Sequence, residues 1–160
     1  MKNDNEMIWS CLFHFGTHMW YDIPVEKEKA LSGSTSGVYE SLRFDEKVWR
    51  EWTDAMVKGG TNMVVMDIGE GVKYPSHPEL AIKGSWSADR LHEEVLRLKK
   101  LGLEPIPKLN FSATHDVWLK DYARMVSTET YHKVIADLVQ NQISDFAHQH
   151  IIIPLRKDIS

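Results

Sequence analysis

The 160-residue sequence predicts an α/β fold in which parallel β-strands alternate with helices. Two observations lead to this prediction. Short apolar runs and stretches with helical apolar spacing follow one another as β-α-β-α-β-α-β, an order typical of parallel sheets with right-handed crossovers. Polar and aromatic side chains also gather where the predicted strands end. A (β/α)8 barrel needs about 250 residues, so we expect a single domain over 1–160 that forms about half of such a barrel. A small open α/β sheet remains the alternative architecture.

Composition excludes several classes of protein. With 42% hydrophobic residues the chain is too apolar to be disordered, and its net charge of −4 gives no basic surface for nucleic acid. The single cysteine, Cys11, excludes an internal disulfide framework and a multi-cysteine zinc site. We find neither a signal peptide nor an apolar run of membrane-spanning length. We therefore expect no membrane partner; the cellular location stays open, with the cytoplasm as the default.

The first half of the chain predicts one strand and one helix. Residues 7–15 form a mostly apolar, aromatic run, which favours a buried strand. Asp45 is placed to cap a helix over 44–59, and a Gly-Gly pair ends it. We expect both tryptophans of this helix to lie in the core. The apolar residues that recur at helical spacing are Val48, Trp49, Trp52, Ala55 and Met56.

The second half repeats the alternation. Residues 62–68 and 103–109 are strand-like, and Ser87 is placed to begin the helix between them. A third helix follows Thr128, and the run 151–155 predicts a fourth strand. The predicted inner face of the helix that Ser87 begins is Leu91, Val95, Leu98 and Leu101. That of the helix after Thr128 is Tyr131, Val134 or Ile135, Leu138 and Val139. Charged pairs on the second helix are expected to face solvent: Glu93 and Glu94, Lys99 and Lys100.

The segments that follow the strands carry the chemically rich side chains. In parallel α/β folds the ligand site lies at the carboxyl ends of the strands. Aromatic rings beside carboxylates and amides suit a carbohydrate, whose rings offer apolar C–H faces bordered by hydroxyls. We therefore expect a carbohydrate ligand. The candidate residues are His14, His18, Trp20, Asp22, Asp67, Glu70, Lys108, Asn110, His115 and Trp118.

Three segments carry a resemblance to a known family. They are 62–70 (NMVVMDIGE), 77–80 (HPEL), and 102–110 (GLEPIPKLN) followed by His115. In this order they resemble the catalytic barrel of the glycoside hydrolases that contain the β-N-acetylhexosaminidases. The resemblance implies a (β/α)8 barrel that hydrolyses O-glycosidic bonds without a metal or an organic cofactor.

The chain also departs from that family. Lys108 stands where the family has Glu, and Asn110 where it has Asp. The adjacent Asp-Glu pair that the family carries on its fourth strand is not present. Glycoside hydrolysis commonly uses two positioned carboxyl groups. We therefore expect a catalytic-domain fragment that is incomplete alone. If the chain is active, Asp67 and Glu70 are its candidate catalytic carboxylates.

Two other functional hypotheses stay open, and the fragment hypothesis has a consequence for assembly. The chain can be a complete, non-catalytic carbohydrate-binding or interaction module, or a complete enzyme that uses Asp67 or Glu70. A half-barrel would have open sheet edges, and such edges invite pairing with another chain. We therefore expect self-association.

Several candidates also have structural interpretations. His14 and His18 beside Asp67 would suit a metal, but no tight ligand motif accompanies them, so we predict no metal and a hydrogen-bonded His14. Lys108 and Asn110 alternate along a strand and therefore share a face. An ion pair of Lys108 with Asp67 or Glu70 competes with a role in substrate binding.

Two further residues are assigned structural roles on the same grounds. Cys11 lies within a strand, and we expect it to pack in the core. Asp116 is placed to cap a short helix over 117–122.

Overall fold

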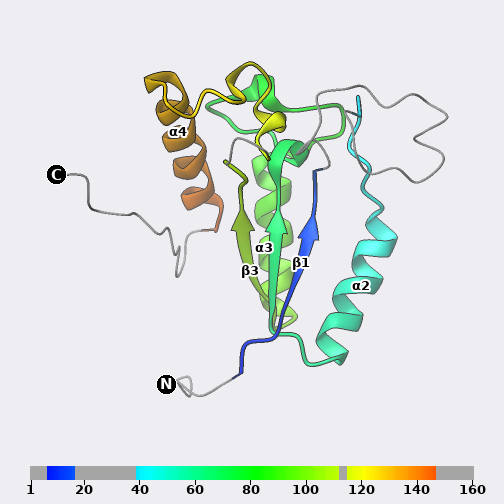
Figure 1. The fold of residues 1–160 in the computed structure, drawn as a ribbon. Helices are drawn as coiled ribbons and strands as arrows, with labels where there is room; N and C mark the ends of the chain where they lie inside the picture. The colour runs from blue at the N-terminus through cyan, green and yellow to red at the C-terminus, as the bar shows by residue number, and fades with distance from the viewer. Residues whose placement is uncertain (1–6, 17–38, 112–114, 147–160) are drawn as a thin grey trace.

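The computed structural model describes residues 7–16, 39–111 and 115–146 and shows an α/β fold (Figure 1). Its sheet has three parallel strands in the order β1-β2-β3. The strands are β1 (Ser10–His14), β2 (Met63–Asp67) and β3 (Glu104–Lys108). The first three predicted strands are thus confirmed. The fourth, over 151–155, lies outside the described residues.

Three helices connect and cover the strands: α2 (Glu46–Lys58), α3 (Ala88–Lys100) and α4 (Glu129–Phe146). The predicted caps are confirmed. The Asp45 carboxylate accepts from the Val48 amide at 3.0 Å, and the Ser87 hydroxyl accepts from the Arg90 amide at 3.2 Å. Gly102 follows α3 with a φ of 85°, a left-handed backbone that favours glycine.

The two faces of the sheet differ. Alternate residues of each strand, such as Phe13 and Met66, point toward the helices, and the Phe13 ring lies 4.5 Å from that of Trp49 on α2. Figure 1 shows α3 lying behind the sheet. On the other face Leu12, Val65 and Ile106 stand in register, and the Leu12 side chain is 48% exposed. Helices therefore cover one face of the described sheet and leave the second less covered.

Two predictions about the core are wrong. Trp49 is buried as expected, but Trp52 is half exposed because the buried stripe of α2 runs through Trp49, Thr53 and Met56. Glu94, predicted to face solvent, is buried on the inner face of α3. Its carboxylate accepts from the Trp49 indole N–H at 2.6 Å and from the Arg97 guanidinium at 2.6 to 3.0 Å. The hydrogen bonds from Trp49 on α2 and Arg97 on α3 make burial of the Glu94 charge tolerable.

Other expectations about packing are confirmed. Tyr131, Val134 and Leu138 form the buried face of α4, and Leu91 and Leu98 are buried on α3. The partly buried Cys11 packs against this core.

Three short 3-10 helices complete the described part of the chain. They are η1 (Gly69–Gly71), η2 (Pro78–Leu80) and η3 (Val117–Tyr122), and Figure 1 shows them beyond the carboxyl ends of the strands. Within the described ranges, the structure has no helix of the length and apolar character that a bilayer crossing requires.

Candidate functional site

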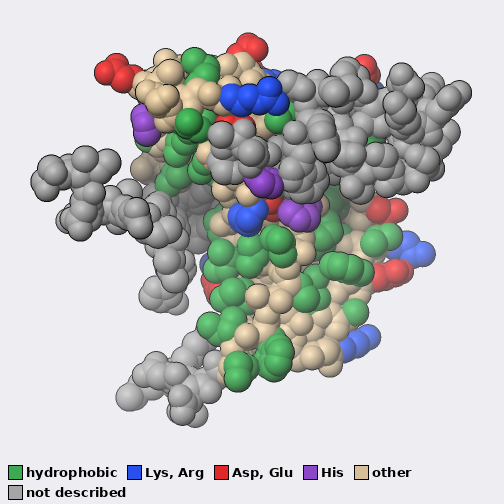
Figure 2. All heavy atoms as spheres, viewed as in Figure 1, with side chains coloured by type: hydrophobic (Ala, Val, Ile, Leu, Met, Phe, Trp, Pro, Cys, Tyr) green, Lys and Arg blue, Asp and Glu red, His purple; other side chains and the backbone are tan. Residues whose placement is uncertain are grey.

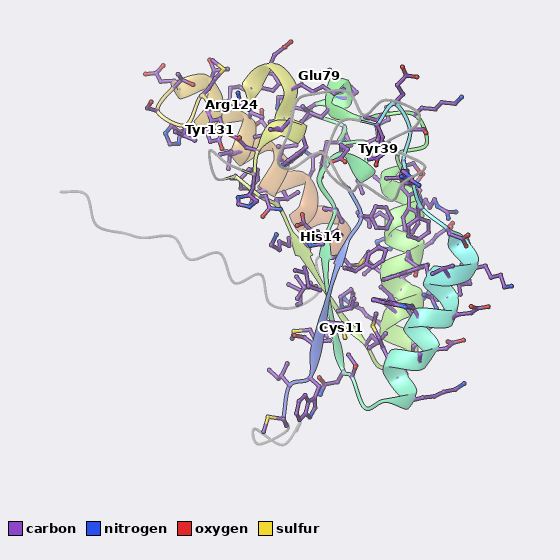
Figure 3. The ribbon with its side chains drawn as sticks, turned by 45° about the vertical axis from the view of Figure 1, so that its right-hand side comes forward. Cys11, His14, Tyr39, Glu79, Arg124 and Tyr131 are labelled. Carbon is purple, nitrogen blue, oxygen red and sulfur yellow. The ribbon has the colours of Figure 1, made fainter. Side chains whose placement is uncertain are left out.

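The parallel register brings three predicted site residues together. His14, Asp67 and Lys108 are the last residues of their strands and stand directly opposite one another. Because side chains alternate along a strand, all three project from the face that the helices do not cover. Asn110 follows two residues after Lys108 and joins them. We call these four side chains the polar row; Figure 3 shows its His14 at the upper end of β1.

Asp67 is the centre of the polar row. Its Oδ2 atom accepts from Lys108 Nζ at 2.6 Å and from Asn110 Nδ2 at 2.6 Å, and it lies 3.2 Å from His14 Nδ1. Lys108 Nζ also donates to Asn110 Oδ1 at 2.6 Å. The Asp67 side chain is only 2% exposed, against 36% for Lys108 and 43% for His14. The predicted ion pair of Lys108 with Asp67, the shared face of Lys108 and Asn110, and the hydrogen-bonded His14 are confirmed.

Trp118 of η3 contacts the end of the polar row. Its indole N–H donates to the Asn110 carbonyl at 2.8 Å, and its ring packs 6.1 Å from each of the Tyr74 and Phe111 rings. The Trp118 side chain is 1% exposed. It therefore holds the end of the polar row in place, and its predicted contact with a sugar stays a prediction.

Glu70 lies elsewhere at this end of the sheet. It belongs to η1, is 1% exposed, and its carboxylate lies against the Gly16 backbone just beyond β1. A Cβ atom at Gly16 would come within 2.3 Å of Glu70 Oε2, so a larger residue there would force the Glu70 side chain to shift. Asp67 and Glu70 thus occupy different surroundings, and a catalytic role for either stays a prediction.

Asp116 stands at the start of η3, but its carboxylate does not cap that helix. It is fully buried and accepts from the Arg124 amide at 2.8 Å, which holds Arg124 at a φ of 63°. Burial, and then the Asp116 charge, raise the pKa of Tyr131 to about 12. Figure 3 shows Arg124 and Tyr131 near each other above the sheet. The capping role predicted for Asp116 is therefore corrected, while a site role for the adjacent His115 remains a prediction.

A second polar group joins the loops to α4. His77 Nδ1 lies 3.0 Å from Glu79 Oε1, and His77 Nε2 lies 3.2 Å from Asp137 Oδ2. A neutral imidazole carries one N–H, so both contacts are hydrogen bonds only when both nitrogens are protonated. We call this group the His77 bridge. Sequence reasoning missed it because Asp137 follows His77 by 60 residues and belongs to no shared motif.

The carboxylates of the His77 bridge are stabilised in their charged form. The hydrogen bond from Lys133, and then that from His77, lower the pKa of Asp137 below its ordinary 3.8. For Glu79 desolvation acts to raise the pKa, but hydrogen bonds from its own backbone, from His77 and from Tyr122 lower it below 4.5.

We predict that Asp137→Asn makes the chain less sensitive to acid. A carboxylate whose folded-state pKa is lowered contributes stability above its unfolded pKa, and this contribution is lost as the pH falls through the folded value. Urea unfolding between about pH 5 and about pH 2 should therefore show a smaller loss for Asp137→Asn than for the unmodified chain. The exposed Asp54→Asn is the control, and an unchanged acid dependence in Asp137→Asn would contradict the prediction.

Three of the ten candidates, His18, Trp20 and Asp22, lie outside the described residues. Within the described part of the chain no three His, Cys, Asp or Glu side chains are placed to hold a metal ion. The polar row can instead hold a hydroxylated or charged small molecule through hydrogen bonds from its partly exposed side chains, Lys108 and His14. No protein-family model, curated protein or solved structure matches this chain.

Proposed function

We propose that this chain is a glycoside-hydrolase-like catalytic-domain fragment that supplies the carbohydrate-binding wall of a partial (β/α) barrel. The parent activity is hydrolysis of O-glycosidic bonds. The predicted fourth strand over 151–155 carries no adjacent Asp-Glu pair of the kind found in the family that the chain resembles. We therefore expect the chain to bind sugar but to be catalytically incomplete alone.

The polar row is the observation that carries this proposal. It lies at the carboxyl ends of three parallel strands, where (β/α) barrels place their ligand sites. It also projects from the less covered face of the sheet, beyond the apolar row of Leu12, Val65 and Ile106. In a closed barrel this face is the interior, where inward-pointing side chains from the strands stack in layers.

A second candidate is a non-catalytic carbohydrate-binding module. The hydrogen bonds of Asp67 favour it, since Oδ2 is already engaged by Lys108 and Asn110. A carboxylate engaged in this way serves to orient its neighbours. Assays with nitrophenyl glycosides test both candidates: hydrolysis by the unmodified chain that Asp67→Ala abolishes would contradict the binding module and also the catalytic incompleteness of the fragment.

We predict that Asp67→Asn weakens sugar binding by about tenfold or more, because it removes the charged acceptor that positions Lys108 and Asn110, and a hydrogen bond to a charged group contributes about 1.5 to 3 kcal/mol. Calorimetric titration of the full chain with a panel of mono- and oligosaccharides measures this effect. Asp54→Asn, which removes an exposed carboxylate on α2, is the matched control and should bind like the unmodified chain. Absence of binding to every sugar of the panel would overturn the proposed function.

The partial barrel also predicts self-association with a second copy. Among the described residues β1 and β3 each have one strand neighbour, and the Leu12 side chain on their open face is half exposed. Light scattering should find a dimer that Leu12→Asp dissociates. Leu96→Asp, an equally exposed leucine on α3, is the control and should leave the dimer intact. A monodisperse monomer of the unmodified chain would contradict this prediction.

A further inference from the structure

We infer that the polar row selects a sugar carrying an anionic group, a carboxylate or a sulfate, over a neutral sugar. This inference rests on the proposed function and adds the substrate class. It follows from which donors and acceptors of the polar row are already used and which are exposed.

The acceptor at the centre of the polar row, Asp67 Oδ2, is occupied. Each oxygen of a carboxylate has about two lone pairs, and Asp67 Oδ2 already receives Lys108 and Asn110 at 2.6 Å with His14 at 3.2 Å. Asn110 Oδ1 accepts from Lys108. The Asp67 side chain is also almost completely buried. A sugar hydroxyl approaching the polar row therefore meets no open acceptor on Asp67 Oδ2.

A donor of the polar row faces outward. The Lys108 ammonium carries three N–H bonds, and the structure assigns two of them, to Asp67 Oδ2 and Asn110 Oδ1. The Lys108 side chain is 36% exposed, so its third N–H can reach a ligand. Because two hydrogen bonds already fix the ammonium, a ligand gains this contact without having to order a flexible lysine.

The exposed positive charge of the polar row is the Lys108 ammonium. The one carboxylate of the polar row is buried, while Lys108 and the ring of His14 are partly exposed. Figure 2 shows blue and purple side chains around a small red area in the middle of this face, above a mainly green area. A surface that offers donors and positive charge favours a ligand that brings acceptors and negative charge. Among sugars, those that carry a carboxylate or a sulfate meet this requirement best.

Titration of the full chain with glucuronate, glucose 6-sulfate and glucose tests the inference. We expect the better anionic sugar to bind about tenfold more tightly than glucose, which is the worth of one charge-assisted hydrogen bond. The sugar that shows the larger ratio identifies carboxylate or sulfate as the preferred group. Lys108→Met should bring the ratio close to one, while Lys47→Met, an exposed lysine of α2, should leave it unchanged.

Two further measurements keep the test decisive. If circular dichroism shows that Lys108→Met is unfolded, Lys108→Arg retains the charge and should keep a ratio above one, and added salt should lower that ratio in the unmodified chain. Equal binding of all three sugars would overturn this inference and leave the proposed function standing. If the chain binds neither these three sugars nor any other sugar at millimolar concentration, both the inference and the proposed function are overturned.

Discussion

Glu94→Ala is expected to lower the free energy of unfolding by about 3 kcal/mol, because removing one partner of a buried ion pair leaves the other charge uncompensated. Glu94 is 5% exposed and accepts from both Trp49 and Arg97. Arg97 also donates to the Thr53 hydroxyl at 3.0 Å, so this group joins α2 to α3. Without Glu94 the indole N–H and the guanidinium lose their acceptor in the interior. Urea unfolding followed by circular dichroism measures the loss.

The neighbouring Glu93 provides the control for this prediction. Glu93→Ala removes the same chemical group from the exposed side of the same helix. A surface substitution of this kind changes stability by about 0.5 kcal/mol or less. Equal midpoints for Glu93→Ala and Glu94→Ala would show that the buried network does not join the two helices.

Trp118→Ala is expected to lower the free energy of unfolding by about 4 kcal/mol, since it removes a large buried ring and leaves a cavity. Trp118 packs against Tyr74 and Phe111 and donates to the Asn110 carbonyl. The same substitution should weaken sugar binding because Asn110 would lose its support. Urea unfolding and calorimetric titration measure the two effects.

Two matched variants separate the packing of Trp118 from its hydrogen bond. Trp118→Phe retains an aromatic ring but removes the N–H, and it should cost about 1 kcal/mol from the lost hydrogen bond. Trp9→Ala removes a tryptophan that is 63% exposed and should cost much less than Trp118→Ala. A cost for Trp118→Ala no larger than that for Trp9→Ala would contradict the supporting role.

Local signals predicted the elements and part of the site. The sequence predicts Asp45 and Ser87 as helix caps, because a capping side chain accepts a hydrogen bond from the backbone amide three residues later. This interaction involves only residues that are close in the sequence. The period of two along a strand placed Lys108 and Asn110 on one face. The predicted parallel order then placed His14, Asp67 and Lys108 at the same edge, and the register confirmed it.

Other features depended on partners that are distant in the sequence. Glu94 is flanked by Glu93 and looks like part of a solvated face, and only the approach of Trp49 makes its burial tolerable. His77 meets Asp137 because α4 packs over the loops. Asp116 precedes a helix, yet its carboxylate bonds to the Arg124 amide instead of capping that helix.

The sequence by itself determined the alternation of strands and helices, their caps, and the set of side chains at the carboxyl ends of the strands, since periodicity and capping act over a few residues. Only the tertiary structure decided which carboxylate is buried, which cation is exposed, and which donors meet which acceptors. The physical reason is that burial and hydrogen bonding depend on surfaces contributed by segments far apart in the chain. In the polar row this difference decides the chemistry, because Asp67 is enclosed by its neighbours while Lys108 and His14 remain partly exposed.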